Sequence, residues 1–402
     1  MIMMKFRIPA MCAAVVTLAT CSTVKPVKPA GPVAALRESP VVHTRWRTVH
    51  KGHANIGNGV YIREDDDLVV NTPMPIVLRR TYNSGDRFAR PFGLATTHAG
   101  EWWLHGNGDH AVPWGELILA DGARIRFERI TPGPTEEGAV LRHDSTPTEF
   151  NGSLLSFTGA LWELRFPDGS FASFGPPKVC FLQERRDADG HRIQYVRDAS
   201  NTLLRMESEG QSIAFEYDAQ KRIVRASDTT GKDVSYGYDD LGRLVRAAGN
   251  NGVVRQYEYD ERNNMVAIRE PGRIVRNWFD EKGRWSRQVV KSGEDDPDPY
   301  VATAHYVVEG NSVVETDFDE GDGLNVFRFN ERHYVLSETL DADGDAPIVF
   351  TYDRDEITNV LKGATLSCRA ASGPISRRVR VESGNDKAVR DALVRENCLR
   401  RP

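Results

Sequence analysis

Carboxylates in the segment Asp317–Gly323 are the nearest approach in this sequence to a calcium-binding loop. Such a loop supplies oxygen ligands from fixed positions and closes with a bidentate carboxylate at its twelfth residue. Gly321 stands at the fifth position, which needs an oxygen ligand, and Arg328 stands at the twelfth, where its cation would repel the ion. The segment therefore indicates an acidic turn between two strands. We expect neither a metal nor any other cofactor.

Two groups of histidines and one acidic run could also hold a cation. The first group surrounds Trp102 and Trp103, and the acidic run is Glu64–Asp67. Because the histidine spacings match no strong ligand signature, we interpret these histidines as polar loop residues that face solvent. We interpret the acidic run as the start of a strand that its charges keep soluble. The two groups are His98, His105, Asp109 and His110, and His43, His50 and His53.

Other catalytic patterns are missing from the sequence. It has no phosphate-binding loop, nucleophile elbow, paired-cysteine zinc motif or His-Glu-x-x-His segment. A net charge of -5 gives no general attraction to nucleic acid or to an anionic membrane surface. The seven tryptophans would mostly fill the covered face of a sheet, and any that stay exposed could bind carbohydrate. We therefore expect a protein without enzymatic activity.

Repeated hairpins are the elements that would position any site. The pairs Tyr217-Asp218, Tyr238-Asp239 and Tyr259-Asp260 recur, with their aspartates 21 residues apart. Around the central copy, residues 234–239 and 243–246 alternate in polarity on either side of a short turn that contains Gly242. This alternation is typical of the two strands of a β-hairpin. Each copy therefore predicts one hairpin.

Weaker copies extend the array upstream through Asp198 and downstream through Asp280, Asn330 and Asp353. A short hairpin loop needs a residue that tolerates positive φ, and Gly, Asn and His tolerate it best. We expect that residue three positions after each anchor, where five of the seven copies carry one of these types. The seven residues are Asn201, Lys221, Gly242, Asn263, Gly283, His333 and Glu356.

The repeated units, such as residues 234–246, are similar to the YD repeats of the bacterial RHS family. Residues 59–84, with Asp67-Leu68, Pro73, Pro75 and Tyr82-Asn83-Ser84, resemble the DUF6531-like domain of unassigned role that opens many RHS proteins. The resemblance implies an all-β fold in which antiparallel hairpins form a curled continuous sheet or partial shell. It covers residues 55–360 or so and leaves the tail outside.

The length of 402 residues predicts two or three domains. The tail would be a small cap with a strand at 377–381 and a helix that begins near Ser383 or Asn385, and it would cover the last strand edge. A partner-docking or toxin-like element is the alternative for this tail. The expected divisions are a signal peptide at 1–20, a Pro-rich tether at 21–45, an amino-terminal β-domain at 46–178, hairpin repeats at 179–361 and the cap at 362–402.

The amino terminus predicts export. Lys5 and Arg7 precede a short apolar stretch, as in a secretory signal. The sequence Leu18-Ala19-Thr20-Cys21 then resembles the lipobox of bacterial lipoproteins, which implies lipidation of Cys21, and Ser22 resembles the pattern for outer-membrane sorting. We expect an outer-membrane lipoprotein that faces the periplasm or the cell surface. A periplasmic or secreted protein without the lipid is the alternative.

Three further cysteines would remain in the mature chain. Cys368 and Cys398 flank a segment long enough to close, and an oxidising compartment would permit a disulfide between them. Three cysteines leave one unpaired, so the sequence alone does not assign the pairing. Cys180 lies in a strand-like run and is expected to be a buried thiol.

The best-known use of the RHS family is to encase a toxic carboxy-terminal domain. A cargo of about 150 residues needs a wall of roughly 140 Å for one turn. About 16 strands at about 4.8 Å each give a sheet only ~80 Å wide. We therefore expect a wall that encloses no guest and has a binding or structural role at the bacterial envelope, with an envelope protein or a carbohydrate as partner. The alternatives are a miniature toxin that acts through its last 40 or so residues and a remnant of a longer toxin-encapsulating protein.

Overall fold

The computed structural model describes residues 54–106, 112–144, 149–175, 180–310, 312–321, 323–331, 334–345, 347–354, 361–370 and 373–380. These residues form strands and turns, and none of them is helical. The predicted all-β fold, with antiparallel hairpins in a curled continuous sheet, is confirmed. The predicted helix near Ser383 lies outside the described residues. Within the described ranges, no helix has the length and hydrophobicity that crossing a membrane would need.

A four-stranded antiparallel sheet, called here the inner sheet, comes first. Its centre is the hairpin of β2 and β3, which pair from Ile62↔Asn83 to Val70↔Ile76. Two prolines, Pro73 and Pro75, lie in the connection, where they interrupt no ladder hydrogen bond. The strands are β1 (Ala54–Asn55), β2 (Val60–Val70), β3 (Ile76–Asn83) and β6 (Thr96–His98). The chain that connects β3 to β6 forms a separate two-stranded ribbon of β4 (Ala89–Arg90) and β5 (Gly93–Leu94).

The next strands close into a ring. β7 pairs with β8 and the pairing continues strand by strand to β14, and the residues just before β14 return to β7. There Trp103 bridges Phe181, and Leu104 N donates to the carbonyl of Cys180 over 2.9 Å. Cys180 is buried, as predicted. The strands are β7 (Trp103–Gly106), β8 (Trp114–Ile118), β9 (Arg124–Arg129), β10 (Val140–Arg142), β11 (Leu154–Phe157), β12 (Trp162–Arg165), β13 (Phe171–Phe174) and β14 (Leu182–Arg186).

From β14 onward the same sheet continues as a single curved layer, called here the wall. Each strand pairs with the next one in sequence, and β31, the last described strand, pairs with β30. The strands are β15 (Arg192–Arg197), β16 (Leu203–Ser208), β17 (Gln211–Tyr217), β18 (Ile223–Asp228), β19 (Asp233–Tyr238), β20 (Leu244–Gly249), β21 (Val254–Tyr259), β22 (Met265–Glu270), β23 (Arg273–Phe279), β24 (Trp285–Lys291), β25 (Tyr300–Glu309), β26 (Ser312–Asp319), β27 (Leu324–Phe329), β28 (Val335–Leu340), β29 (Ile348–Arg354), β30 (Leu361–Ala370) and β31 (Gly373–Arg380).

The repeat anchors build the turns along one edge of the wall. Asp239 Oδ1 accepts the backbone N–H groups of Leu241 (3.1 Å) and Arg243 (2.9 Å), and Gly242 N donates to the Asp239 carbonyl. Equivalent bonds form around Asp198, Asp218, Asp260 and Asp280. The side-chain oxygen of the anchor satisfies backbone donors that a tight turn leaves without a strand partner, and Asn330 does the same for Tyr334 N over 3.0 Å.

The predicted positive φ values are confirmed at Asn201, Lys221, Gly242, Asn263 and Gly283. Lys221 adopts φ 64° although lysine does not favour this region, so the turn overrides the preference of the residue. His333 and Glu356 lie outside the described residues.

A β-bulge precedes each of the anchors Asp218, Asp239, Asp260 and Asp280 and helps to curve the wall. The register shifts between Glu216 and Tyr217 and between Glu258 and Tyr259, with the same shift in the copies between and after them. A bulge bends its strand and increases the local twist. The 21-residue repeat therefore carries curvature as well as a turn.

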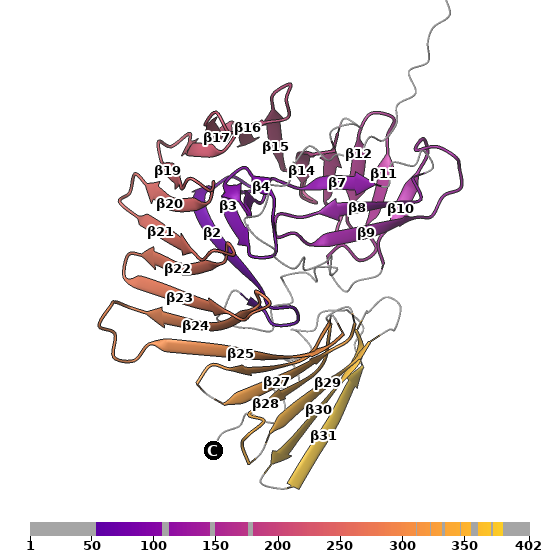
Figure 1. Cartoon of the computed structure of the whole chain (residues 1–402). Helices are drawn as coiled ribbons and strands as arrows, with labels where there is room; N and C mark the ends of the chain where they lie inside the picture. The colour runs from indigo at the N-terminus through magenta and orange to yellow at the C-terminus, as the bar shows by residue number, and fades with distance from the viewer. Residues whose placement is uncertain are drawn as a thin grey trace, which may run out of the picture.

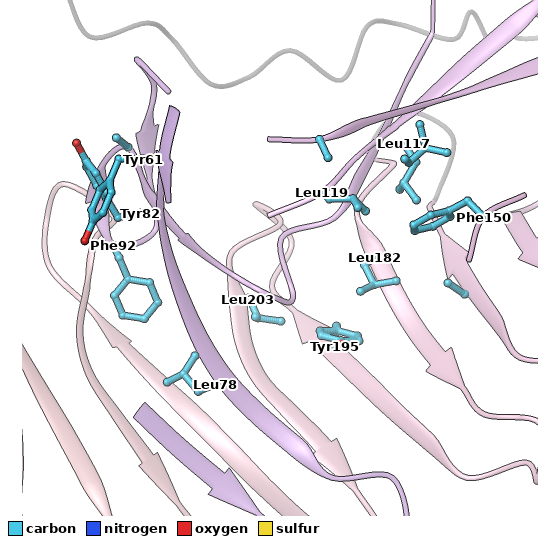
Figure 2. Packing of buried hydrophobic residues seen from close by; sticks show 14 of the residues in the cluster. Tyr61, Leu78, Tyr82, Phe92, Leu117, Leu119, Phe150, Leu182, Tyr195 and Leu203 are labelled. Atoms are coloured by element: carbon cyan, nitrogen blue, oxygen red, sulfur yellow. The ribbon is translucent and has the colours of Figure 1, made fainter. Parts of the chain in front are cut away.

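Figure 1 shows that the wall curves around the inner sheet, with β2 and β3 on its concave side. The apolar residues of the inner sheet, the ring and the wall as far as β27 form one continuous core, and Phe350, Tyr352, Ala364 and Leu366 of β29 and β30 form a second cluster. Figure 2 shows part of this core, with Tyr61, Leu78, Tyr82 and Phe92 of the inner sheet region on one side and Leu117 and Phe150 of the ring region on the other. The hollow of the wall is therefore occupied by the amino-terminal part of the same chain.

Candidate functional site

The junction between the inner sheet and the wall contains a buried group of charges, called here the junction network. On the inner sheet, Arg80 Nε and Nη2 bond the two oxygens of Asp67 over 2.9 and 3.1 Å. Arg63 Nε donates to Asp65 over 2.9 Å, and Arg80 Nη2 lies 3.4 Å from Asp65 Oδ2. The side chains of Arg80 and Asp67 are 1% and 0% exposed. These four charged groups are therefore removed from water, and each needs an oppositely charged partner to offset the cost of its burial.

The wall completes the junction network from strands β19, β21 and β22. The hydroxyl groups of Tyr236 and Tyr257 donate to Asp67 Oδ2 (2.9 Å) and Asp65 Oδ2 (3.1 Å). Arg255 Nη1 lies 3.3 Å from Asp67 Oδ1, and Glu270 Oε2 lies 3.4 Å from Arg63 Nη2. Arg63, Arg80 and Arg255 thus face three carboxylates across two sheets. A fourth arginine, Arg273, pairs with Glu270 over 3.0 Å at the margin of the network.

Strand geometry explains why both aspartates point inward. Asp65 and Asp67 are two residues apart and therefore lie on the same face of β2. A bulge between Asp66 and Leu68 then shifts the pairing, so that Asp67 has no opposite residue on β3. The bulge lets Leu68 rather than a polar residue continue the buried face. Asp66 lies outside and pairs with Arg79 over 2.6 Å.

Electrostatics in the junction network favour the charged forms. Burial alone would raise the pKa of the Asp65 carboxyl, but the guanidinium groups of Arg80 and Arg63 hold that pKa well below its usual range. Burial, together with the charge of Asp67, raises the pKa of the Tyr236 hydroxyl. The hydroxyl groups of Tyr236 and Tyr257 therefore act as hydrogen-bond donors to the two carboxylates, and these bonds join the wall to the inner sheet.

Our interpretation of Glu64–Asp67 as the start of a strand kept soluble by charge is wrong for Asp65 and Asp67. Their side chains are 3% and 0% exposed and belong to the junction network. The nearby arginines of β3 could have suggested ion pairs within the hairpin. No feature of the sequence could have shown that residues 169 to 192 positions downstream cover them.

Backbone contacts fix the rest of the junction. Leu94 N donates to the Gly242 carbonyl over 2.9 Å, and Trp285 N donates to the Gly59 carbonyl over 2.8 Å. A Cβ on Gly93 would lie 2.3 Å from the Gly242 oxygen, and Gly93 has φ +88°. Glycine is required there because β5 of the two-stranded ribbon touches the turn of a repeat through its backbone.

The predicted repeat tyrosines form a ladder between successive hairpins. Tyr217, Tyr238 and Tyr259 donate their hydroxyl hydrogens to the carbonyls of Leu203, Ile223 and Leu244 over 2.6, 2.5 and 2.8 Å. The next copy has Phe279, which lacks a hydroxyl, and the Asn277 amide donates to the corresponding Met265 carbonyl over 3.0 Å instead. The anchors therefore have a structural role, since each joins one hairpin to the one before it.

The arginine four residues after several anchors extends this ladder. Arg222 and Arg243 each bond the preceding aspartate over 2.7 Å through Nε. They then lie over the rings of Tyr238 and Tyr259, with 4.4 and 5.1 Å to the ring centres. Each aspartate is thereby coupled to the tyrosine of the following hairpin.

Our interpretation of the histidines as solvent-facing loop residues is wrong for His98. It is fully buried on β6, between the rings of Phe92 and Phe215. Burial lowers the pKa of its imidazole to about 4, and Nδ1 accepts the N–H of Gly100 over 3.1 Å. His105 lies beside Trp114, with 6.2 Å between ring centres. His43, His50, His53, Asp109 and His110 lie outside the described residues.

Among the described residues, Asp187, Asp189 and His191 have ligand atoms close enough to hold a metal ion. Their geometry is that of a repeat turn, because His191 N and Nδ1 bond the Asp187 carboxylate over 2.9 and 3.0 Å. Of the other predicted site residues, Cys368 lies on β30, and its backbone pairs with Ile375. Cys21 and Cys398 are outside the described residues, so lipidation and the disulfide stay predictions.

The fold and the junction define a β-hairpin-repeat protein whose curved wall holds its own amino-terminal sheet. Residues 53–127 match the family described as Domain of unknown function (DUF6531), and residues 238–275 match RHS Repeat. These two matches support an RHS-repeat protein with an amino-terminal DUF6531 domain. The predicted family resemblance is confirmed by these two matches.

Among solved structures, the chain is similar to "Crystal Structure of TcdB2-TccC3-TEV" and "Crystal Structure of TcdB2-TccC3-Cdc42", each with 10% identity and a TM-score of 0.35. Both matches cover 80% of this chain, which spans 22% and 23% of those chains. A porin-like protein from Bacteroides uniformis also matches, with 10% identity, a TM-score of 0.21 and coverage of 56% of this chain and 91% of that chain. No curated protein matches the sequence.

Proposed function

We propose that this RHS-repeat protein is exported to the bacterial envelope, is anchored by a lipid on Cys21 and has a non-enzymatic binding role there. The observation that carries the binding role is the occupied hollow of the wall. Asp65, Asp67, Arg63, Arg80 and their partners on the wall are committed to joining the two sheets. A wall whose concave side holds its own sheet offers its outer face and its edges to a partner.

The outer face supports a protein as that partner. Opposite charges alternate across its neighbouring strands, where Arg225 lies 3.1 Å from Glu216 and 3.2 Å from Asp233. Arg269 makes the same kind of pairs with Glu258 (3.2 Å) and Glu294 (2.7 Å). A surface with alternating charges binds preferentially to a partner whose charges are complementary. Such complementarity contributes more to the specificity of binding than to its affinity. An envelope protein therefore fits this face better than a carbohydrate does.

The binding role is tested by capture from envelope extracts with the purified protein, compared with the double variant Arg225→Glu/Arg269→Glu. Arg142→Glu on the ring, where the side chain is 50% exposed, is the matched control. We expect one envelope protein to be captured by the wild type and the control and to be lost with the double variant. Equal capture by all three would contradict the proposed face, and capture that sugars compete away would favour carbohydrate.

The anchor is tested separately by mass analysis of the amino terminus. Acyl chains on Cys21 as the first residue are expected. An unmodified chain that begins elsewhere would remove the anchor and leave the binding role standing.

A further inference from the structure

The outer face of β23 and β24 carries a group of cationic and aromatic side chains, called here the cationic patch. Trp278 lies opposite Arg287 in the sheet, and Arg276 lies opposite Val289. The Arg287 guanidinium lies over the Trp278 ring, 5.0 Å from its centre. Trp278 is 42% exposed, both arginines are exposed and Val289 is buried beside them. The patch therefore presents an aromatic ring and two cations to solvent.

These two arginines differ from other arginines of the outer face. Arg225 and Arg269 each contact two carboxylates. Within the described part of the chain, no carboxylate lies within 4.0 Å of a guanidinium nitrogen of Arg276 or Arg287. Trp and Arg are the side chains most enriched at the energetic centres of protein interfaces. The cationic patch therefore has the composition of a protein-binding surface and lacks an anionic partner among the described residues.

The loop between β24 and β25, residues 292–299, carries the opposite charge and is called here the acidic loop. Asp295 and Asp298 are exposed, and no cation of the described residues lies within 4.0 Å of either carboxylate. The other two acids of the loop, Glu294 and Asp296, already have partners. The same pair of strands therefore carries two unpaired cations towards one end and two unpaired anions at the other.

We propose that two copies of this chain associate through the outer face of β23 to β25. Along β24, the distance from Arg287 to the start of the acidic loop at Ser292 is about 17 Å, at about 3.3 Å per residue. A two-fold axis that crosses the strands midway between these points places the cationic patch of each copy against the acidic loop of the other. Both sets of unpaired charges then have counterparts in the second copy.

A different acidic protein is the main alternative occupant of the cationic patch. Such a partner would pair with Arg276 and Arg287 and would leave Asp295 and Asp298 without cations. A second copy of the chain supplies counterparts for both sets at once. Self-association therefore accounts for more of the observed surface, and it depends neither on the envelope partner nor on a lipid.

The size of the face indicates a reversible dimer. Strands β22 to β25 span three steps between strands, or about 14 Å. A contact of this width falls at the low end of specific interfaces, which is below about 1,200 Å² in total. Its ion pairs contribute more to specificity than to affinity. The dimer should therefore form as the protein concentration rises and dissociate as salt is added.

Analytical ultracentrifugation of the purified protein over a dilution series tests the proposal, with Cys21→Ser in every chain so that no lipid is attached. Arg276→Glu/Arg287→Glu and Asp295→Lys/Asp298→Lys should each raise the dissociation constant of the dimer at least about ten-fold, because like charges then meet in both halves of the contact. An equimolar mixture of the two variants should associate as the starting protein does, since opposite charges meet again in both halves.

The matched control is Arg142→Glu/Arg165→Glu on the ring, where the side chains are 50% and 65% exposed. This control should associate as the starting protein does. A monomer at every concentration would overturn the proposal and leave the cationic patch to a different acidic partner. A mixture that fails to associate would overturn it as well, because the loss in each variant would then not come from pairing of the cationic patch with the acidic loop. An equal loss in the control would have the same consequence.

Discussion

Replacement of Arg80 by methionine tests the junction network at its centre. The side chain of Arg80 is 1% exposed, bonds both oxygens of Asp67 and donates to the Tyr257 hydroxyl over 2.7 Å. Methionine keeps most of the length of the side chain and removes its charge and donors. The variant would leave the carboxylates of Asp65 and Asp67 buried with one fewer cation between them.

The expected loss follows from burial. Removing one partner of a buried ion pair costs about 3–5 kcal/mol, because the remaining charge keeps its desolvation penalty. Arg79→Met is the matched control, since Arg79 is the adjacent residue and pairs with Asp66 over 2.6 Å with 47% of its side chain exposed. A surface pair contributes about 0–1 kcal/mol. Arg80→Met should therefore lower the free energy of unfolding by at least about 2 kcal/mol more than Arg79→Met does.

Urea unfolding followed by tryptophan fluorescence measures this difference, because urea does not screen charges as a salt would. Adding Asp67→Leu to Arg80→Met should recover part of the lost stability, since it removes a buried carboxylate. Equal losses of stability for Arg79→Met and Arg80→Met would refute the view that the junction network holds the two sheets together.

Four further outcomes follow from the structure. Lys221→Gly should raise the free energy of unfolding by about 0.5–1 kcal/mol, because lysine is strained at φ 64°, and thermal unfolding measures it. Gly93→Ala should destabilise more than Gly231→Ala, since both have positive φ but only the first would place a Cβ 2.3 Å from a turn carbonyl. Acidification from pH 6.5 to about 4 should lower the free energy of unfolding by about 3 kcal/mol, because His98 takes up a proton in the unfolded chain and stays neutral in the folded one. Urea unfolding at a series of pH values measures this loss. The variant His98→Asn should show a smaller dependence of stability on pH in this range. Tyr238→Phe should cost about 1 kcal/mol in the same assay, through loss of one bond in the tyrosine ladder.

The hairpins could be predicted because their information is local. An aspartate that accepts backbone donors and a following residue that tolerates positive φ define each turn within five residues, as at Asp239 and Gly242. Residue type alone does not predict every turn. Lys221 adopts a positive φ that lysine disfavours, because the pairing of the neighbouring hairpins fixes the register of its turn. The bulges that curve the wall were not predicted, because each lies at the last residue of its strand and leaves the alternation of polar and apolar residues before it unchanged.

The junction network could not be predicted from the sequence. Asp65 and Asp67 look like the solvent-facing acids that limit edge pairing, and Asp66 between them is one. What distinguishes them is coverage by Tyr236, Tyr257 and Arg255, which lie far along the chain. Contacts at that separation depend on how the wall curves, and no local pattern records this.

Hydrogen exchange of the wild-type protein tests most directly whether the wall holds its own amino-terminal sheet. The account predicts that central amides of β2 and β3 are protected to the same degree as those of β19 to β22, and that both groups open together. Exchange of β2 and β3 that is orders of magnitude faster than exchange of the wall strands would contradict it.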